Sequence, residues 1–210
     1  MAVATELTPL SVALREETSR AHELAEGSDF MTRLMAGDLN REALIAYTGQ
    51  LWFVYEALER VVRDVDTPVG DPRLERHNAI ESDLAELIGS QWRDEIRILP
   101  ATARYVARLE AADALPAVVA HHYVRYLGDV SGGQVIAARL SALYGIGTEA
   151  LSFYDFSAVG KISPYRAAYR AILDEIELTD AERAELIAEA REAFALNSGV
   201  FAALSEIFPA

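Results

Sequence analysis

Hydrophobic residues recur at three- and four-residue intervals along most of the chain, which is the spacing of one face of an α-helix. The longest such stripe, in residues 40–65, consists of Leu44, Thr48, Leu51, Tyr55, Leu58, Val62 and Val65. No alternating run bounded by turn residues indicates a β-strand. The pattern therefore predicts an all-α fold.

Capping and turn residues set the ends of the predicted helices. We expect Thr8 to be the N-cap of a first helix that begins at Pro9 and runs to Gly27. Asn40 is expected to cap the long helix, and the sequence TDAE at 179–182 is a capping box before the last one. The other predicted helices are 28–35 with Ser28 as cap, 75–88, 101–112, 116–144 and one that begins at Ser163.

The stretches 66–72 and 145–159 are predicted as loops. The helices are too many and too short for a simple four-helix coiled bundle. We therefore expect a single multi-helical domain over residues 1–210, with helices that cross at varied angles.

The charge and the missing cysteines exclude several kinds of function. The chain has 33 acidic and 19 basic residues and a formal net charge of −14, which argues against nucleic acid as a partner. With no cysteine there is no disulfide, no thiolate catalysis, no cysteine-ligated zinc and no iron–sulfur cluster. We see no signal peptide and no run of eighteen apolar residues, so we expect a cytoplasmic protein without a membrane anchor.

The stretch RYLGDVSGGQ, residues 125–134, places three glycines inside the predicted helix 116–144. Each glycine costs about 1 kcal/mol relative to alanine in a helix interior. Two explanations stay open: a tight helix contact or kink, or a flat, bulky ligand against a backbone without Cβ atoms. Gly128, Gly132 and Arg125 are spaced to share one face, and Asp129 lies four residues from Arg125, the spacing of a surface ion pair.

The four histidines do not form a metal-binding motif, because no H-E-x-x-H or E-x-x-H occurs. His121 and His122 are adjacent and point about 100° apart on a helix, so they cannot share a metal. His77 lies among charged residues and is expected at the surface. His22 lies at the edge of an apolar face with Glu26 four residues on, and two alternatives stay open. It is either a boundary residue of the core or the one imidazole that a haem iron needs, oriented by the carboxylate.

Three segments together resemble the haem oxygenase family. YVRYLGDVSGGQ (123–134) is similar to the family's distal helix, and LREETSRAHELAEGSDFM (14–31) is similar to its proximal helix. AFALNSGVFAAL (193–204) is similar to the C-terminal helix that closes the pocket. The segments occur in the family's order over nearly the whole chain. Because the chain stops at Ala210 without an apolar anchor, it resembles the soluble bacterial type.

The resemblance implies roles for particular residues. His22 would be the axial ligand of the haem iron, with Glu26 beside it. The distal helix would lie against the haem with Gly128, Gly132 and Gly133, and glycine at 128 and 132 would leave room for the porphyrin and O₂. Asp129 would be the distal carboxylate that holds a water molecule near O₂, and the other members of its polar network would be Arg125, Tyr55 and Asn197. The expected propionate contacts are Arg15, Tyr123, Arg166 and Arg170, and the residues expected to pack on the ring are Met31, Phe194 and Phe201.

The implied reaction uses haem b as both cofactor and substrate. It consumes O₂ and electrons and yields biliverdin, by default the α isomer, with carbon monoxide and Fe²⁺, for iron acquisition or bilin supply. Because no flavin or nicotinamide motif occurs, the electron donor would be a separate protein, a ferredoxin or a flavin-dependent NAD(P)H reductase. The alternatives are a non-enzymatic haem carrier or sensor with the same fold, and an all-helical structural or interaction protein. A carrier would not need Asp129 or the glycines.

Overall fold

The computed structural model describes residues 8–209, and within them it contains helices and turns but no strand. The prediction of an all-α fold is confirmed. The α-helices are α1 (Leu10–Glu26), α2 (Asp29–Ala36), α3 (Arg41–Asp64), α4 (His77–Ile88), α5 (Trp92–Glu95), α6 (Pro100–Glu110), α7 (Leu115–His122), α8 (Gly128–Tyr144), α9 (Ile162–Glu175) and α10 (Asp180–Ile207).

Local capping explains some of the helix ends and not others. Asn40 accepts a hydrogen bond from the Ala43 backbone N–H at 3.0 Å, and Thr179 forms the predicted capping box with Glu182. The expectation for Thr8 is wrong, because the N-cap of α1 is Pro9 and no side chain of α1 caps it. Ser28 occupies the N-cap of α2, but among the described residues its buried hydroxyl has no hydrogen-bond partner.

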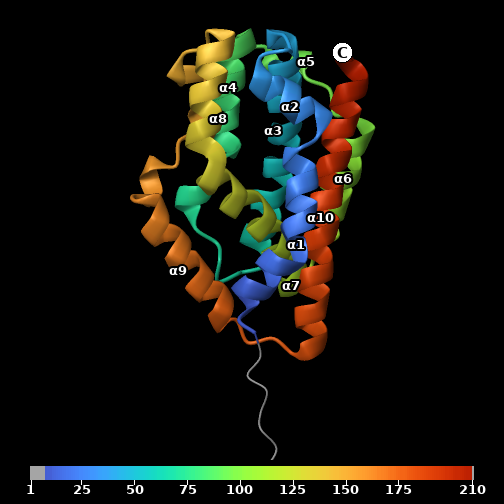
Figure 1. The fold of residues 1–210 in the computed structure, drawn as a ribbon, viewed down its shortest axis with the longest axis vertical. Helices are drawn as coiled ribbons and strands as arrows, with labels where there is room; N and C mark the ends of the chain where they lie inside the picture. The colour runs from blue at the N-terminus through green and yellow to red at the C-terminus, as the bar shows by residue number, and fades with distance from the viewer. Residues whose placement is uncertain (1–7, 210) are drawn as a thin grey trace, which may run out of the picture.

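The core forms around α3, which packs against α4 and α6, while α10 packs along α1, α6 and α7. The predicted stripe of α3 faces this core from Leu44 to Leu58, and Val62 and Val65 at its end are half-buried. Figure 1 shows α1 between α10 on one side and α8 and α9 on the other. The structure therefore places α1 where it can form one wall of a site against α8 and α9.

The predicted helix 116–144 is a continuous helical run with one irregular turn. Residues Tyr123–Leu127 (η2) form a π-helical turn between α7 and α8. A π turn closes i→i+5 hydrogen bonds and holds an additional residue, which changes the direction of the side chains that follow it. The irregularity therefore precedes the glycines instead of lying at them.

The predicted loops are only partly irregular. The segment 145–159 contains three short 3₁₀ turns, of which η4 (Ser152–Tyr154) packs against α4 and α8. Asp83 of α4 is buried, and its carboxylate accepts hydrogen bonds from the backbone N–H groups of Ser152 at 2.7 Å and Phe153 at 2.8 Å. The short helix α5 was not predicted, because four residues are too few for helical periodicity to show.

Candidate functional site

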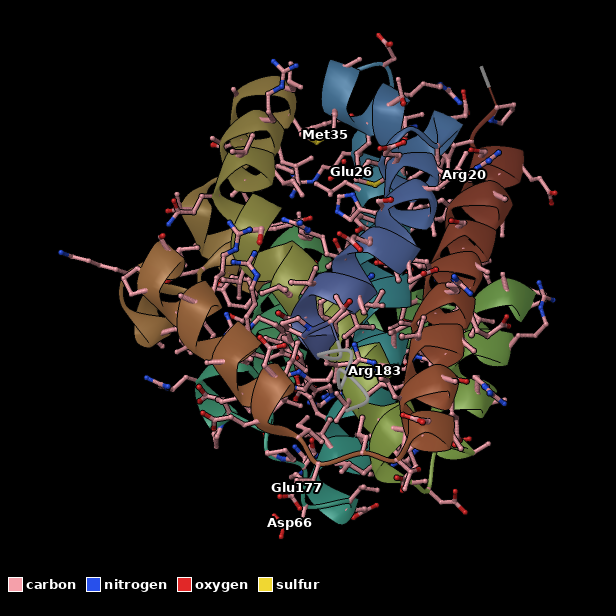
Figure 2. All side chains as sticks on the ribbon, turned by 60° about the horizontal axis from the view of Figure 1, so that its bottom comes forward. Arg20, Glu26, Met35, Asp66, Glu177 and Arg183 are labelled. Carbon is pink, nitrogen blue, oxygen red and sulfur yellow. The ribbon has the colours of Figure 1, made fainter. Side chains whose placement is uncertain are left out.

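A cavity of about 450 Å³ lies between α1, the run η2–α8, α9 and α10. Its size is within the range of small-molecule sites in proteins. It brings together residues from both ends of the chain, and Glu26, near the end of α1, lies between this helix and α8 (Figure 2). The lining residues are Arg15, Thr18, Ser19, His22, Glu23, Glu26, Tyr123, Val124, Leu127, Gly128, Ser131, Gly132, Arg166, Arg170 and Phe194.

His22 lines the cavity with a side chain that is 47% exposed. Its Nδ1 lies 3.6 Å from Glu26 Oε2, and the edge of its ring meets the Phe194 ring with centroids 5.8 Å apart. The carboxylate on the Nδ1 side leaves Nε2 on the opposite side of the ring. Within residues 8–209 no group of three or more histidine or acidic side chains could hold a bare metal ion. A haem iron needs only one imidazole from the protein, which His22 can supply.

The glycines at the start of α8 have two different explanations. A Cβ built on Gly128 would have no described atom within 4 Å, and one on Gly132 would meet only Ile136 Cδ1 at 3.8 Å. Both residues line the cavity, so an added side chain would enter it. A Cβ on Gly133 would instead lie 3.2 Å from the Tyr154 carbonyl oxygen. Close helix packing therefore explains Gly133, which does not line the cavity, whereas no protein neighbour requires glycine at 128 or 132.

Three arginines form the basic part of the lining, and the Tyr123 hydroxyl group lies among them. Arg166 and Arg170 lie one turn apart on α9, and Arg15 approaches from α1. The Arg166 Nε is buried and, among the described residues, has no hydrogen-bond partner. A buried donor without an acceptor is costly, and a planar carboxylate is the acceptor that a guanidinium pairs with best. Burial raises the pKa of Tyr123, while Arg170 and Arg15 act to lower it.

The four residues predicted to form a polar network come together from four elements. The Tyr55 hydroxyl on α3 donates to Asp129 Oδ2, and Arg125 Nη2 lies 3.7 Å from the same oxygen. Arg125 Nη1 donates to Asn197 Oδ1 on α10 at 2.8 Å, and its Nε reaches the Tyr55 hydroxyl at 3.4 Å. Burial raises the pKa of Asp129 well above its usual range. The network is adjacent to the cavity through Gly128, the neighbour of Asp129 in sequence.

The shared face of Arg125 with Gly128 and Gly132 is a wrong prediction. Gly128 and Gly132 line the cavity, whereas Arg125 is buried and directed at Tyr55 and Asn197. The reason is the additional residue of the π turn, which breaks the three- and four-residue spacing between Arg125 and the glycines. The turn thus places the guanidinium in the network.

Comparisons with known proteins point to one family. The family model described as Heme oxygenase matches residues 8–203. The chain belongs to the haem oxygenase family. It is 38% identical to Heme oxygenase 1 of Gallus gallus, over 94% of this chain and 70% of that protein. It is 34% identical to Heme oxygenase 1 of Synechocystis sp., over 91% of this chain and 83% of that one.

The fold matches as well. The solved structure of haem oxygenase-1 from the cyanobacterium Synechocystis sp., described as a complex with haem, superposes with a TM-score of 0.89 at 30% identity. That match covers 95% of this chain and 94% of the solved one. The resemblance predicted from the three segments is confirmed. In this member of the haem oxygenase family, no helix within residues 8–209 is long and apolar enough to cross a membrane.

Not every residue predicted to pack on the ring lines the cavity of this haem oxygenase. Phe194 does, but Met31 is half-buried against the core, and Phe201 is buried there with its ring 6.5 Å from that of Phe30. Their hydrophobicity fits a core position as well as a ligand wall, so the sequence could not separate the two. Contact of Met31 and Phe201 with haem stays a prediction.

The other three histidines take structural positions. His77 is half-buried with its ring centroid 5.5 Å from that of Trp52, so the expected surface position is wrong. His121 Nε2 lies 2.8 Å from Glu189 Oε1, and His122 Nδ1 lies 2.7 Å from the Tyr169 hydroxyl. Burial lowers the pKa of His122 to about 3. The two adjacent rings thus have separate partners, as their directions on a helix predict.

Three buried tyrosines near the polar network were not expected from the sequence. Burial raises the pKa of Tyr47 and of Tyr105 to about 12, and Arg125 acts to lower both. Burial also raises the pKa of Tyr154 well above its usual range, and the charge of Asp129 raises it further. Tyr47 could have been found as a hydroxyl two turns before Tyr55 in α3, but nothing in the predicted loop around Tyr154 pointed to the network.

Proposed function

We propose that this haem oxygenase holds haem in the cavity between α1 and α8 and cleaves it to biliverdin, carbon monoxide and ferrous iron. One observation carries the proposal. The cavity has an imidazole on one helix, His22, and a bare backbone on another, at Gly128 and Gly132, where no neighbour within residues 8–209 requires glycine. A flat ligand with a central metal uses both features, since the imidazole binds the metal and the bare backbone leaves room for the ring and for O₂.

The residues of the cavity fit the parts of haem. His22 would bind the iron through Nε2, because Glu26 lies on the Nδ1 side and can orient the ring directly or through water. Arg15, Arg166 and Arg170 would pair with the two propionates, and the unpartnered Nε of Arg166 supports this. When bound, haem supplies the iron centre at which O₂ is reduced.

The protein's own contribution to the chemistry is the handling of protons beside Gly128. Asp129 has a raised pKa because it is buried, so its carboxyl group holds a proton nearer to neutral pH than an exposed aspartate does. Tyr55 donates to this carboxyl, and Arg125, itself bonded to Asn197, lies next to both. We assign to Asp129 the delivery of protons through water toward the distal side of the cavity, and to the other three its positioning.

Oxygen and electrons must come from outside the chain. We propose a ferredoxin or a flavin-dependent NAD(P)H reductase as donor, since the sequence has no cysteine for an iron–sulfur cluster and no nucleotide-binding motif. A cytoplasmic location, a bacterial source and the α isomer of biliverdin belong to the same proposal. The haem carrier is the alternative, and the partly buried network around Asp129 argues against it, because binding alone does not need a proton donor.

The test starts with haem added to the purified protein. With O₂, ascorbate and catalase present, the enzyme should lose its Soret band as biliverdin absorbance appears, whereas a carrier would keep its spectrum unchanged. A protein that does not bind haem in a one-to-one ratio would contradict both functions and leave a structural role.

The His22→Ala variant tests the iron ligand separately. It should bind haem with an altered Soret band and show little turnover, because His22 is the one imidazole among the described residues that line the cavity. Added imidazole should restore part of both, which separates loss of the ligand from misfolding. Wild-type turnover in this variant without added imidazole would contradict the assignment of His22.

A further inference from the structure

Helices α1 and α9 face the same cavity and carry complementary parts of the proposed site. On α1, Arg15 and His22 line the cavity, and on α9, Arg166 and Arg170 do. The two helices pack against each other. The relative position of α1 and α9 therefore decides how far His22 lies from the two arginines of α9, whereas Arg15 shares a helix with His22.

A two-point hydrogen bond joins these helices at one end. The backbone N–H of Ser11 donates to Asp174 Oδ1 at 2.7 Å, and the Ser11 hydroxyl donates to Asp174 Oδ2 at 2.9 Å. Ser11 is buried, and the two residues are 163 positions apart in sequence. We call this contact the Ser11–Asp174 clamp.

The clamp also replaces a missing local cap. The N-cap of α1 is Pro9, which has no side-chain hydrogen-bonding group, and within the described residues no side chain of α1 caps its first turn. Free N–H groups at a helix start need acceptors, and a carboxylate there is favoured by the helix dipole. Asp174 supplies this carboxylate from the last turn of α9. The first turn of α1 is thus completed only when α9 is in place.

The clamp lies one turn from Arg15 on α1 and one turn from Arg170 on α9, and Arg166 is one turn further away. Ser11 precedes Arg15 by four residues, and Asp174 follows Arg170 by four. Residues four apart lie about 6 Å from each other along the helix axis and on the same face of the helix. His22 lies eleven residues after Ser11, about 16 Å further along α1. The clamp therefore holds the arginine end of the α1–α9 pair, and the iron ligand lies towards the other end.

We propose that the Ser11–Asp174 clamp is a positioning device that sets the distance between the iron-binding helix and the carboxylate-binding arginines. By this it determines which bridging carbon of the porphyrin is oxidised. The inference rests on the proposed function. A tetrapyrrole ring bound at its central metal can turn about the metal–imidazole axis, and the pairing of its carboxylates with the arginines fixes the angle. If α9 shifts, Arg166 and Arg170 shift with it, and the ring turns. Other bridging carbons then lie at the place where oxidation occurs.

The first measurement uses the protein without haem. The sequence has no cysteine, so cysteines introduced at the exposed positions Arg20 on α1 and Ala168 on α9 can be spin-labelled without background. Pulsed electron–electron double resonance then gives the distribution of distances between the two spin labels, one on each helix. Asp174→Ala, which removes both hydrogen bonds, should broaden this distribution. Ser11→Ala, which removes only the hydroxyl bond, should broaden it less.

The second measurement is the isomer composition of the bilin formed, separated by chromatography. With Asp174→Ala, the minor isomers should increase about threefold to tenfold relative to the wild type, the range expected for a charged hydrogen bond at a partly exposed site. Ser11→Thr keeps the hydroxyl group, so its isomer composition should stay that of the wild type. The matched control is Glu17→Ala, which removes an exposed ion pair of α1 with Arg191 on α10 and should change neither measurement.

The outcomes separate the clamp from the function on which it rests. An unchanged distance distribution in Asp174→Ala, or an unchanged isomer composition with a broadened distribution, would overturn the inference. A change of equal size in Glu17→Ala would also overturn it, since it would show a general loosening of α1. A wild-type protein that forms no bilin would contradict the proposed function itself, and the spin-label distances would still report whether the clamp holds α1 and α9 together.

Discussion

Two glycines five positions apart should respond differently to the same substitution, both in stability and in haem binding. Gly128 has helical backbone angles, φ −65° and ψ −54°, and a Cβ there would meet no described atom within 4 Å. Alanine is favoured over glycine in a helix by about 1 kcal/mol, so Gly128→Ala should stabilise the haem-free protein by up to this amount. The same methyl group points into the cavity and should weaken haem binding.

Gly133→Ala should give no such gain in stability and should leave haem binding unchanged. Its Cβ would lie 3.2 Å from the Tyr154 carbonyl oxygen and 3.6 Å from the Tyr154 Cα. The turn that carries Tyr154 is held by two hydrogen bonds from its backbone to Asp83, so it cannot easily move away. Overpacking of this kind costs about 1–3 kcal/mol, which cancels or exceeds the helix gain of about 1 kcal/mol. The cavity is not affected, so haem affinity should stay close to that of the wild type.

Thermal unfolding of the haem-free proteins and a haem titration followed at the Soret band measure both effects. A change of 1 kcal/mol moves the melting temperature of a protein of this size by about 2–4 °C. We expect a higher melting temperature and weaker binding for Gly128→Ala, and an equal or lower melting temperature and normal binding for Gly133→Ala. The reasoning is refuted if Gly128→Ala lowers the stability of the haem-free protein, or if Gly133→Ala raises it as much as Gly128→Ala does.

Three further predictions concern charged groups. Asp129→Asn should keep haem affinity but slow bilin formation by about a hundredfold, because the proton donor is lost; single-turnover kinetics check this, and an undiminished rate would remove Asp129 from the mechanism. Burial alone would raise the pKa of Glu189, but hydrogen bonds from His121 and Arg108 hold it at about 2, below its ordinary 4.5. Its ionised form therefore adds up to about 3 kcal/mol of stability above pH 4.5, which is lost as the pH falls toward 2. Urea unfolding should show a flatter acid limb for Glu189→Gln, and a parallel limb would contradict the assignment. Finally, Arg166→Ala should weaken haem binding about tenfold, since a charged hydrogen bond is lost. Arg73→Ala, at an exposed arginine outside the cavity lining, should leave binding unchanged; equal losses in a haem titration would exclude a specific role for Arg166.

The sequence by itself determined the parts of the protein that depend on neighbours along the chain. The all-α fold and most helix limits follow from periodicity and from caps such as Asn40 and Thr179, which act within four residues. The spacing of Arg166 and Arg170 placed both on one face of α9, and both line the cavity. The family was also recognisable, because its segments are continuous stretches of the chain.

Tertiary contacts decided what depends on residues far apart in sequence. The π turn directs Arg125 at Tyr55 and Asn197, although simple helical spacing predicted a shared face with Gly128 and Gly132. Gly133 faces Tyr154, which no local pattern indicated. The start of α1 is capped by Asp174 from the other end of the chain. Periodicity reports which face of a helix is apolar but not which segment packs against it. The division of the glycines between ligand space and helix packing could therefore be seen only once the helices were in place.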